Sequence, residues 1–436
     1  MAIIATLLTI SGCLVLLFIS QLWWRSYLNP ITLGILVWLP GMVMIHWPPF
    51  FLSPLYIHLN RSVHPLLYLA LAIALASFWA GCALVKMLSK PGAFDLSARP
   101  LSVNVNTPRL LALFALGLAL FAFSYLRSGL MGFATLDEKG VAEAQVSLHL
   151  GSLSFLMFFL NIGAIGFFAR FLETGRWHFA IPMAIAVGCY CLTLQKSPVV
   201  QLLGACLVLA VLYPKASHYL LWRTTAHRAV IVGLAFLMVV TMLSMNFARG
   251  ISAVQMTAAA SPVTEQIYIY SGGSALMNMS TTIEGYLPSD PPTMGLYLAR
   301  PLTWYLVDRS QFVAGAYVEG INAPTYLIYG WVDFRWFGFF ILPLVTGILV
   351  MLFLRSALKG GLIQIMLGVT AVRVVIFSSA TDVILDPTTW ILLGVSLIAH
   401  VATRDYRAAK IPPAPRMRPA RLPARRAYAP PGRPSS

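Results

Sequence analysis

Basic side chains outside the C-terminal tail are the residues of this sequence best suited to chemistry. Arginine binds phosphate oxygens through a planar fork that stays protonated, so it can hold a diphosphate and stabilise its charge as it leaves. Arg373 lies inside an apolar run, where an ionisable residue is costly and is therefore a functional candidate. Each of these cations could alternatively reach lipid headgroups from the membrane interface. The candidate cations are Lys196, Arg249, Arg300, Arg309, Arg335 and Arg373.

Carboxylates near these cations in the sequence are candidates for the base that an acceptor hydroxyl group would need. No histidine occurs between His227 and His400, so this stretch has no imidazole base. Asp308 could equally form an ion pair with the adjacent Arg309. The sequence does not choose among the four candidate acids, which are Glu265, Asp308, Glu319 and Asp333.

Motifs for nucleotide or metal chemistry are missing from the sequence. It has no Walker A loop, GxGxxG, HExxH, kinase signature or Asp-x-Asp pair. The longest loop that we expect inside the cell runs only from Ser89 to Thr107. A transfer reaction would therefore take place on the outer face with a substrate that is already activated. A lipid-linked diphosphate fits this requirement, and we expect neither a metal nor a cofactor.

The composition places these candidate residues in a membrane protein. Of the 436 residues, 59% are hydrophobic and 10% are charged, whereas soluble domains carry about 25% charged residues. A run of about 20 apolar residues is long enough to cross a bilayer. We expect an all-α polytopic fold with about eleven transmembrane helices. The expected segments are 2–24, 31–47, 65–88, 108–126, 151–172, 179–195, 198–213, 229–247, 333–354, 361–380 and 387–402.

The distribution of charge predicts the orientation and excludes nucleic acid as the partner. The net charge is +16, but nine of the 30 Lys and Arg lie in the last 34 residues, in a tail rich in Pro, Ala and Arg. Such a tail is typical of a disordered flank that stays in the cytoplasm and touches anionic lipid. Counting helices backwards places the N-terminus and the longest loop outside. The expected domains are helices one to eight (1–247), a large extracytoplasmic loop (248–332), helices nine to eleven (333–402) and the cytoplasmic tail (403–436).

Tyrosine and tryptophan are interleaved with the charged residues of the large loop. Both residue types anchor protein at membrane interfaces, and both stack on sugar rings. Tyr268, Tyr270 and Tyr326 are the aromatic candidates for binding a substrate. Short apolar stretches such as Met294–Leu298 predict surface helices within the loop.

The end of this loop resembles a known family. The stretch Asn322–Gly338 (NAPTYLIYGWVDFRWFG), which leads into a long apolar helix, is similar to the segment that closes the large loop of bacterial oligosaccharide repeat-unit polymerases of the Wzy type. Ala248–Gly250 (ARG) and Tyr268–Gly273 (YIYSGG) also resemble segments of this family.

Two further positions fit the same resemblance. Arg309 is followed by ten residues and then Gly320, as in the Arg-x10-Gly pattern of these polymerases. Lys196, in the sequence QKSP, lies where the family often has a basic residue before a helix. A second Arg-x10-Gly starting at Arg249 is absent, because Ala260 stands at the matching position.

The resemblance implies a GT-C-like fold and a glycosyl transfer at the outer face of the inner (cytoplasmic) membrane. A glycan on a polyprenyl diphosphate would move onto a fresh lipid-linked repeat unit, giving O-antigen or exopolysaccharide without a metal or a nucleotide. The implied partners are the polyprenyl diphosphate-linked oligosaccharide, the lipid bilayer, a chain-length regulator and a flippase, but no nucleic acid.

The resemblance also divides the candidate residues by role. The implied catalytic residues are Arg249, Arg309, Glu265, Asp308, Glu319 and Asp333. The implied substrate-binding residues are Lys196, Arg300, Arg373, Tyr268, Tyr270, Gly320, Asn322 and Tyr326. The alternatives are an O-antigen-type ligase and a flippase or other transporter of lipid-linked oligosaccharide. Related ligases resemble a scheme with a loop histidine, so the lack of one favours a polymerase.

Overall fold

The protein is helical throughout the part that the computed structural model describes. The described residues are 2–24, 29–46, 63–90, 94, 103–129, 143, 147–148, 151–193, 196–212, 225–250, 273–285, 293–303, 306, 325–357, 359–378 and 383–404. These residues contain no β-strand, and an isolated antiparallel bridge joins Val105 to Arg404. The predicted all-α class is confirmed.

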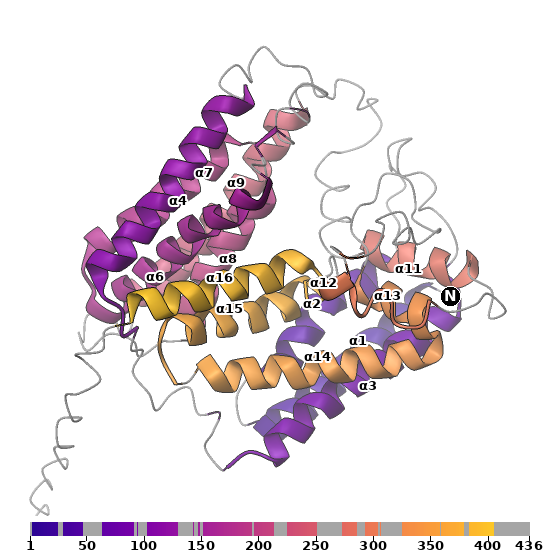
Figure 1. Ribbon diagram of the computed structural model, residues 1–436. Coiled ribbons are helices and arrows are strands. Elements are labelled where there is room, and N and C mark those ends of the chain that lie inside the picture. The colour runs from indigo at the N-terminus through magenta and orange to yellow at the C-terminus, as the bar shows by residue number, and fades with distance from the viewer. Residues whose placement is uncertain are drawn as a thin grey trace, which may run out of the picture.

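Figure 1 shows the helices in their spatial arrangement. In chain order they are α1 (Ala2–Trp24), α2 (Pro30–Met44), α3 (Leu66–Met87), α4 (Thr107–Ser128), α6 (Phe158–Thr174), α7 (Ile181–Leu192), α8 (Lys196–Leu212), α9 (Thr225–Gly250), α11 (Gly273–Gly285), α12 (Arg300–Thr303), α13 (Tyr326–Phe334), α14 (Trp336–Ala357), α15 (Leu362–Phe377) and α16 (Pro387–Thr403). Two 3-10 helices, Gly151–Met157 and Trp177–Ala180, precede α6 and α7.

The apolar segments expected from the sequence coincide with helices, and their ends differ by a few residues. Within the described part of the chain, four helices are long and apolar enough to cross a membrane, and shorter apolar helices of 10–17 residues account for the other expected segments. The four are Leu66–Met87, Thr107–Ser128, Leu153–Thr174 and Trp336–Ala357. The helix content and its apolar character support a membrane protein.

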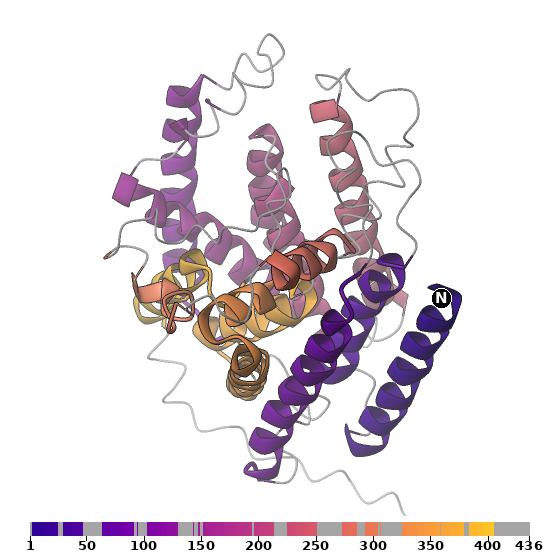
Figure 2. The same cartoon turned by 90° about the vertical axis from the view of Figure 1, so that its right-hand side faces the viewer.

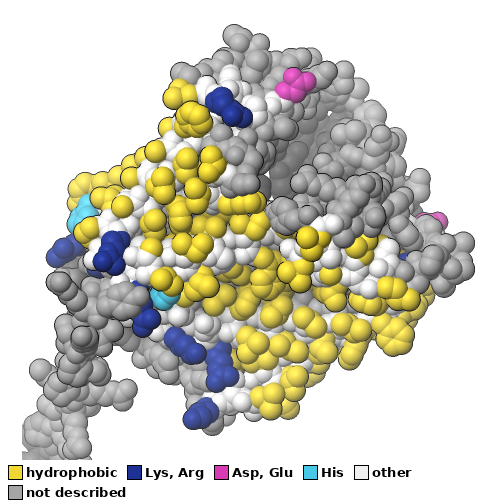
Figure 3. All heavy atoms as spheres, viewed as in Figure 1, with side chains coloured by type: hydrophobic (Ala, Val, Ile, Leu, Met, Phe, Trp, Pro, Cys, Tyr) yellow, Lys and Arg dark blue, Asp and Glu magenta, His cyan; other side chains and the backbone are white. Residues whose placement is uncertain are grey.

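Large apolar side chains are exposed on the outer faces of these helices. Leu8 is 69% exposed, Phe236 is 69% exposed and Ile398 is 61% exposed. Figure 3 shows such side chains spread over much of the visible surface. Exposure on this scale is unfavourable in water but costs nothing in the hydrocarbon of a bilayer.

Short polar side chains begin several of the helices. Asn29, Asn106, Thr325 and Asp386 stand at the N-caps of α2, α4, α13 and α16, and each accepts a hydrogen bond from a backbone N–H of the first turn. Proline follows the cap in α2, α4 and α16, where its missing N–H costs nothing. The helix starts are therefore encoded locally.

Two apolar clusters form the interior. The first apolar cluster contains buried residues of α4, α6, α7, α8, α9, α15 and α16, such as Phe114, Leu160 and Leu209. The second contains buried residues of α1, α2, α3, α11, α13, α14 and α15, such as Leu67, Trp331 and Phe339. Helix α15 contributes to both clusters and joins the two parts of the molecule (Figure 1).

Helices α3 and α14 pack side by side through two glycines. A Cβ atom at Gly81 would overlap the carbonyl oxygen of Leu344, and one at Gly347 would overlap that of Phe78. Small residues at such crossings let helix backbones approach closely in a membrane. This contact fixes the second cluster, against which the short helices α11 and α13 pack.

Basic side chains gather along one edge of the molecule (Figure 3). Lys86 lies in the last turn of α3 and Arg355 in the last turn of α14. Helices α11, α12 and α13 lie away from this edge in the same view (Figure 1). The molecule therefore has a basic edge, and the described helices α11, α12 and α13 lie away from it.

Candidate functional site

The corner between α13 and α14 is the first part of the site. The sequence predicted one helix starting at Asp333, but the structure has two helices separated at Arg335, whose φ of 53° is rare for a residue with a side chain. At this corner Gly330 and Gly338 face each other so closely that a Cβ atom on Gly338 would overlap the backbone of Gly330. The guanidinium of Arg335 lies 5.6 Å from the centre of the Trp331 ring.

Asp333 holds the segment before α12 against this corner. Its side chain is 1% exposed. Its Oδ1 accepts hydrogen bonds from Thr293 Oγ1 (2.5 Å) and the backbone N–H of Tyr297 (3.1 Å), and its Oδ2 accepts one from the N–H of Leu298 (2.6 Å). A buried carboxylate needs donors of this kind. Since both oxygens are occupied, Asp333 positions the segment that leads to Arg300.

Arg300 is held by two stacked tyrosines. Its Nη1 donates a hydrogen bond to the hydroxyl oxygen of Tyr329 (3.1 Å), and its Cζ lies 5.4 Å from the centre of the same ring. The rings of Tyr297 and Tyr329 stack with centroids 5.2 Å apart. Arginine over an aromatic face is a favourable arrangement that also restricts its rotamers. Arg300 is therefore fixed in place at the start of α12.

Arg373 is buried near the C-terminal end of α15. Its side chain is 7% exposed, and its Nε has no hydrogen-bond partner among the described residues. Its neighbours on α15 belong to different clusters: Val372 lies in the first and Val374 in the second. An arginine at the junction of two apolar clusters is expensive. The carboxylate of Asp386 is the described charge that acts on it.

Two buried hydroxyl groups accompany Arg373. The Oγ1 atoms of Thr370, three residues before it on α15, and of Thr389, on the first turn of α16, are buried without a hydrogen-bond partner in the described part of the chain. Side chains three residues apart lie next to each other on the same face of a helix. The contact between α15 and α16 thus contains donors that the described protein atoms do not satisfy.

Both arginines lie on elements that pack against α16. Helix α12 and helix α15 each contact α16. The C-terminal end of α16 lies beside the start of α4, where Arg404 bridges to Val105, and Figure 1 shows α12 at the other end. Asp386 caps this N-terminal end by accepting a hydrogen bond from the N–H of Thr388 (2.9 Å). Arg300 and Arg373 therefore both lie toward the N-terminal end of α16.

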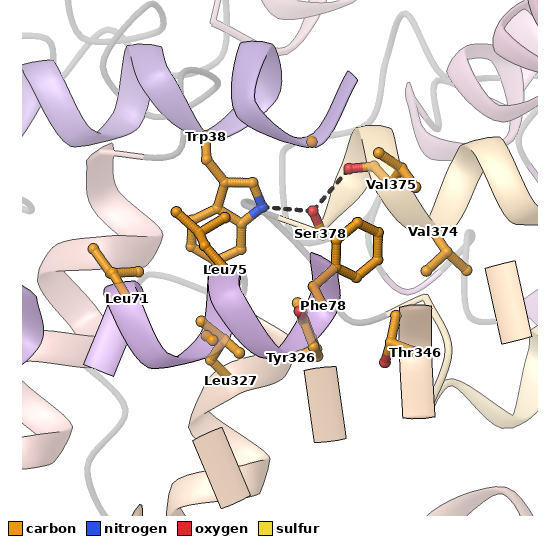
Figure 4. Close-up of a pocket in the computed structure, with 12 residues that line it drawn as sticks. Trp38, Leu71, Leu75, Phe78, Tyr326, Leu327, Thr346, Val374, Val375 and Ser378 are labelled. Atoms are coloured by element: carbon orange, nitrogen blue, oxygen red, sulfur yellow. Dashed lines mark hydrogen bonds between the residues drawn. The ribbon is translucent and has the colours of Figure 1, made fainter. Parts of the chain in front are cut away.

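The end of α15 is fixed from the opposite side by α2. Trp38 Nε1 donates a hydrogen bond to Ser378 Oγ (2.7 Å), and this hydroxyl donates to the carbonyl oxygen of Val375 (2.7 Å), as Figure 4 shows. These residues line a small cavity of about 20 Å³, to which Tyr326 also contributes. Tyr326 begins α13 and is buried, so its position couples the corner at α13 to the end of α15.

The remaining predicted site residues fall into two groups. Lys196 begins α8 and Arg249 lies in the last turn of α9, but the directions of their side chains lie outside what is described. The other group lies outside the described residues: Glu265, Tyr268, Tyr270, Asp308, Arg309, Glu319, Gly320 and Asn322. Of the predicted set, Asp333 holds the segment that leads to Arg300, and Arg373 lies on α15, which like α12 packs against α16.

Sequence reasoning missed the partners of these residues. Thr293 was not a candidate, and Tyr297 and Tyr329 were part of a general set of loop aromatics without a paired role. Their contacts join residues 29 to 40 positions apart. No local signal pairs them, although Asp333 itself was a candidate because it is a carboxylate near the candidate cations in the sequence.

Among the described residues, no group of three or more His, Cys, Asp or Glu side chains could hold a metal ion. The chain matches no protein-family model, no curated protein and no solved structure. The chemistry of the site therefore has to be inferred from its own geometry.

Proposed function

We propose that this protein is a glycosyltransferase of the membrane that polymerises lipid-linked oligosaccharide repeat units. In this proposal about eleven apolar helices span the inner membrane. The basic edge faces the cytoplasm, and α11, α12 and α13 lie on the extracytoplasmic face. The observation that carries the proposal is the burial of Arg373 at the junction of two apolar clusters, at the end of α16 where α12 presents Arg300.

A buried arginine with an unsatisfied Nε needs a partner that compensates its charge. A structural ion pair would do so, but the described residues place no carboxylate within 4 Å of Arg373. An anionic ligand supplies a better one, because charge-assisted hydrogen bonds to phosphate satisfy a guanidinium completely. On the extracytoplasmic side of a membrane, an activated sugar donor is linked to a lipid phosphate, and the proposal takes the diphosphate form.

The reaction balances without a cofactor. The bond between the anomeric carbon of the donor glycan and the diphosphate oxygen breaks, and the acceptor hydroxyl oxygen forms the new glycosidic bond. The electron pair stays on the polyprenyl diphosphate, whose charge Arg300 and Arg373 stabilise. The proton of the acceptor goes to a carboxylate, for which Glu265, Asp308 and Glu319 are the candidates. Lys196, Arg249 and Arg309 would complete the cationic surface.

Asp333 has a supporting role in this proposal. Both of its oxygens accept hydrogen bonds from the segment 293–298, so it orients Arg300 and does not take the acceptor's proton. Tyr329, stacked on Tyr297, restrains Arg300, and in this proposal the restrained guanidinium contacts the diphosphate.

The test is the incubation of purified protein in vesicles with a lipid-linked repeat unit, followed by gel analysis. A ladder of products of increasing length supports the proposal. Transfer of a single preformed glycan to another acceptor would identify a ligase. Movement of the lipid-linked unit across the membrane, with no product, would identify a transporter and overturn the proposal.

A further inference from the structure

An apolar hollow lies between α1, α2 and α3, separate from the arginines. Its volume is about 400 Å³. Its walls come from the length of all three helices: Leu8 and Leu16 of α1, Ile31 and Met42 of α2, and Leu75 and Trp79 of α3 are among its lining residues. No charged side chain of the described residues lines it. Such a space in the hydrocarbon of a bilayer is filled by hydrocarbon.

The hollow exists because α1 packs along α2 and leaves the side of α3 open. Helix α1 contacts α2 closely, and Figure 2 shows it at the edge of the molecule. Gly12 of α1 lines the hollow, and a Cβ atom added there would meet nothing within 4 Å. In the proposed membrane orientation this edge of the molecule would face lipid, so a long chain could enter the hollow from the side.

The size of the hollow suits part of a long branched chain. An apolar cavity of about 150 Å³ holds one benzene molecule. A hollow of about 400 Å³ therefore holds on the order of three five-carbon isoprene units. The rest of a longer chain would continue into the bilayer.

One end of the hollow is polar. Tyr68, on the first turn of α3, lines it, and its hydroxyl lies 3.2 Å from Nδ1 of His46, which follows the end of α2. The two rings stack with centroids 5.6 Å apart. The Nε2 of His46 is buried and has no hydrogen-bond partner in the described part of the chain. At the same end, Ser280 of α11 accepts a hydrogen bond from the N–H of His64 (2.7 Å).

The hollow shares part of its wall with the small cavity at the end of α15. Gly34, Leu71, Leu75 and Phe78 line both the hollow and the small cavity beside Trp38 and Ser378. The small cavity reaches Val374, the residue next to Arg373. Helix α11 packs against α2, α3 and α13 and so connects the polar end of the hollow to the corner that holds Arg300. A hydrocarbon chain bound in the hollow and a diphosphate bound at Arg300 and Arg373 can therefore belong to one ligand.

We propose that this hollow binds part of the isoprenoid chain of the polyprenyl diphosphate carrier, with the chain passing His46 and Tyr68 on its way to the diphosphate. The inference rests on the proposed function for the identity of the carrier. It adds a place for the chain that the arginines alone do not supply. Burial of the chain in the protein would hold the carrier while its diphosphate stays at the extracytoplasmic surface.

The test is photolabelling of the full-length protein in phospholipid vesicles. One probe is a polyprenyl phosphate with a diazirine in its chain, and the other is a phosphatidylethanolamine with the same group in an acyl chain. Gly12→Leu and Gly12→Trp fill the hollow from α1. Gly233→Leu and Gly233→Trp are matched controls, because a Cβ atom at Gly233 of α9 also meets nothing within 4 Å but lies outside the hollow.

We expect the polyprenyl probe to label peptides of α1, α2 and α3 in the wild type and the Gly233 variants, and excess unlabelled polyprenyl phosphate to compete. Labelling should be lost in either Gly12 variant, provided that its elution volume in size-exclusion chromatography and its unfolding temperature match those of the wild type. Unchanged labelling in that variant, or labelling by the phospholipid probe that polyprenyl phosphate does not displace, would overturn the proposal. Failure of the proposed function has a different signature: no glycan ladder from the wild type, with the labelling intact.

Discussion

Arg300 contacts Tyr329 in two ways at once, since its Nη1 hydrogen-bonds to the tyrosine hydroxyl at 3.1 Å and its guanidinium lies 5.4 Å from the centre of the ring. The two contacts restrain different motions. The hydrogen bond fixes how far the guanidinium extends, and the ring fixes the plane against which it lies. The result is a cation that is oriented before any ligand arrives.

This relationship predicts a graded effect of substitutions at Tyr329. Tyr329→Phe keeps the ring but removes the hydrogen bond, and a hydrogen bond to a charged group contributes ~1.5–3 kcal/mol. We expect the KM for the lipid-linked repeat unit to rise by about tenfold with a smaller change in kcat. Tyr329→Leu also removes the ring and should be more severe. Steady-state kinetics of polymer formation measure both.

A tyrosine elsewhere in the bundle provides the control for these variants. Tyr125 of α4 stacks on Phe121 with centroids 6.2 Å apart, in the first apolar cluster and remote from Arg300 in the fold. Tyr125→Phe should leave the kinetics unchanged. Equal effects of Tyr125→Phe and Tyr329→Phe would show that Tyr329 acts through general stability.

Asp333→Asn tests the positioning of the segment before α12. The amide nitrogen replaces one acceptor oxygen and faces a donor, so a buried backbone N–H loses its partner. We expect a loss of stability of ~1–3 kcal/mol, seen as a lower Tm in detergent. Glu284→Gln makes the same chemical change at an exposed carboxylate of α11, where it should leave the Tm unchanged. A Tm of Asp333→Asn no lower than that of Glu284→Gln would contradict the role of Asp333.

Gly338→Ala tests the corner between α13 and α14. The added methyl group would overlap the backbone of Gly330, which cannot move without separating the two helices. We expect a large fall in Tm and in the yield of folded protein. Gly394→Ala is the matched control, because a Cβ atom at Gly394 of α16 meets nothing within 4 Å, and alanine favours a helix over glycine by ~1 kcal/mol. Its Tm should stay equal or rise; similar behaviour of the two variants would show that the corner is not tightly packed.

The positions of the helices follow from the sequence because apolar runs and caps are local properties. Asn29, Asn106 and Asp386 stand directly before proline-containing helix starts, and these starts agree with the expected segments. The break at Arg335 was not predictable in this way. It depends on the positive φ of Arg335 and on the contact between Gly330 and Gly338, which form only when α13 folds back on α14.

The site was predictable by residue type but not by arrangement. Arg373 stood out because a charge in an apolar helix is costly, and the structure places it in the interior. The partners of Asp333 and Arg300 come from segments 29 to 40 residues away. Their pairing results from packing around Trp331 and Phe339 in the second cluster, which the sequence pattern does not specify.

Arg373→Met tests the central claim most directly, by comparing stability with polymer formation in one variant. Methionine fills the space of the arginine stem and removes a buried charge, and replacing buried charges by apolar residues is often neutral or stabilising. If Arg373 binds the diphosphate of the substrate, the purified variant should unfold at the same or a higher temperature than the wild type and form no glycan ladder from a lipid-linked repeat unit that the wild type extends. A stable Arg373→Met protein that builds a ladder of wild-type length would contradict the account.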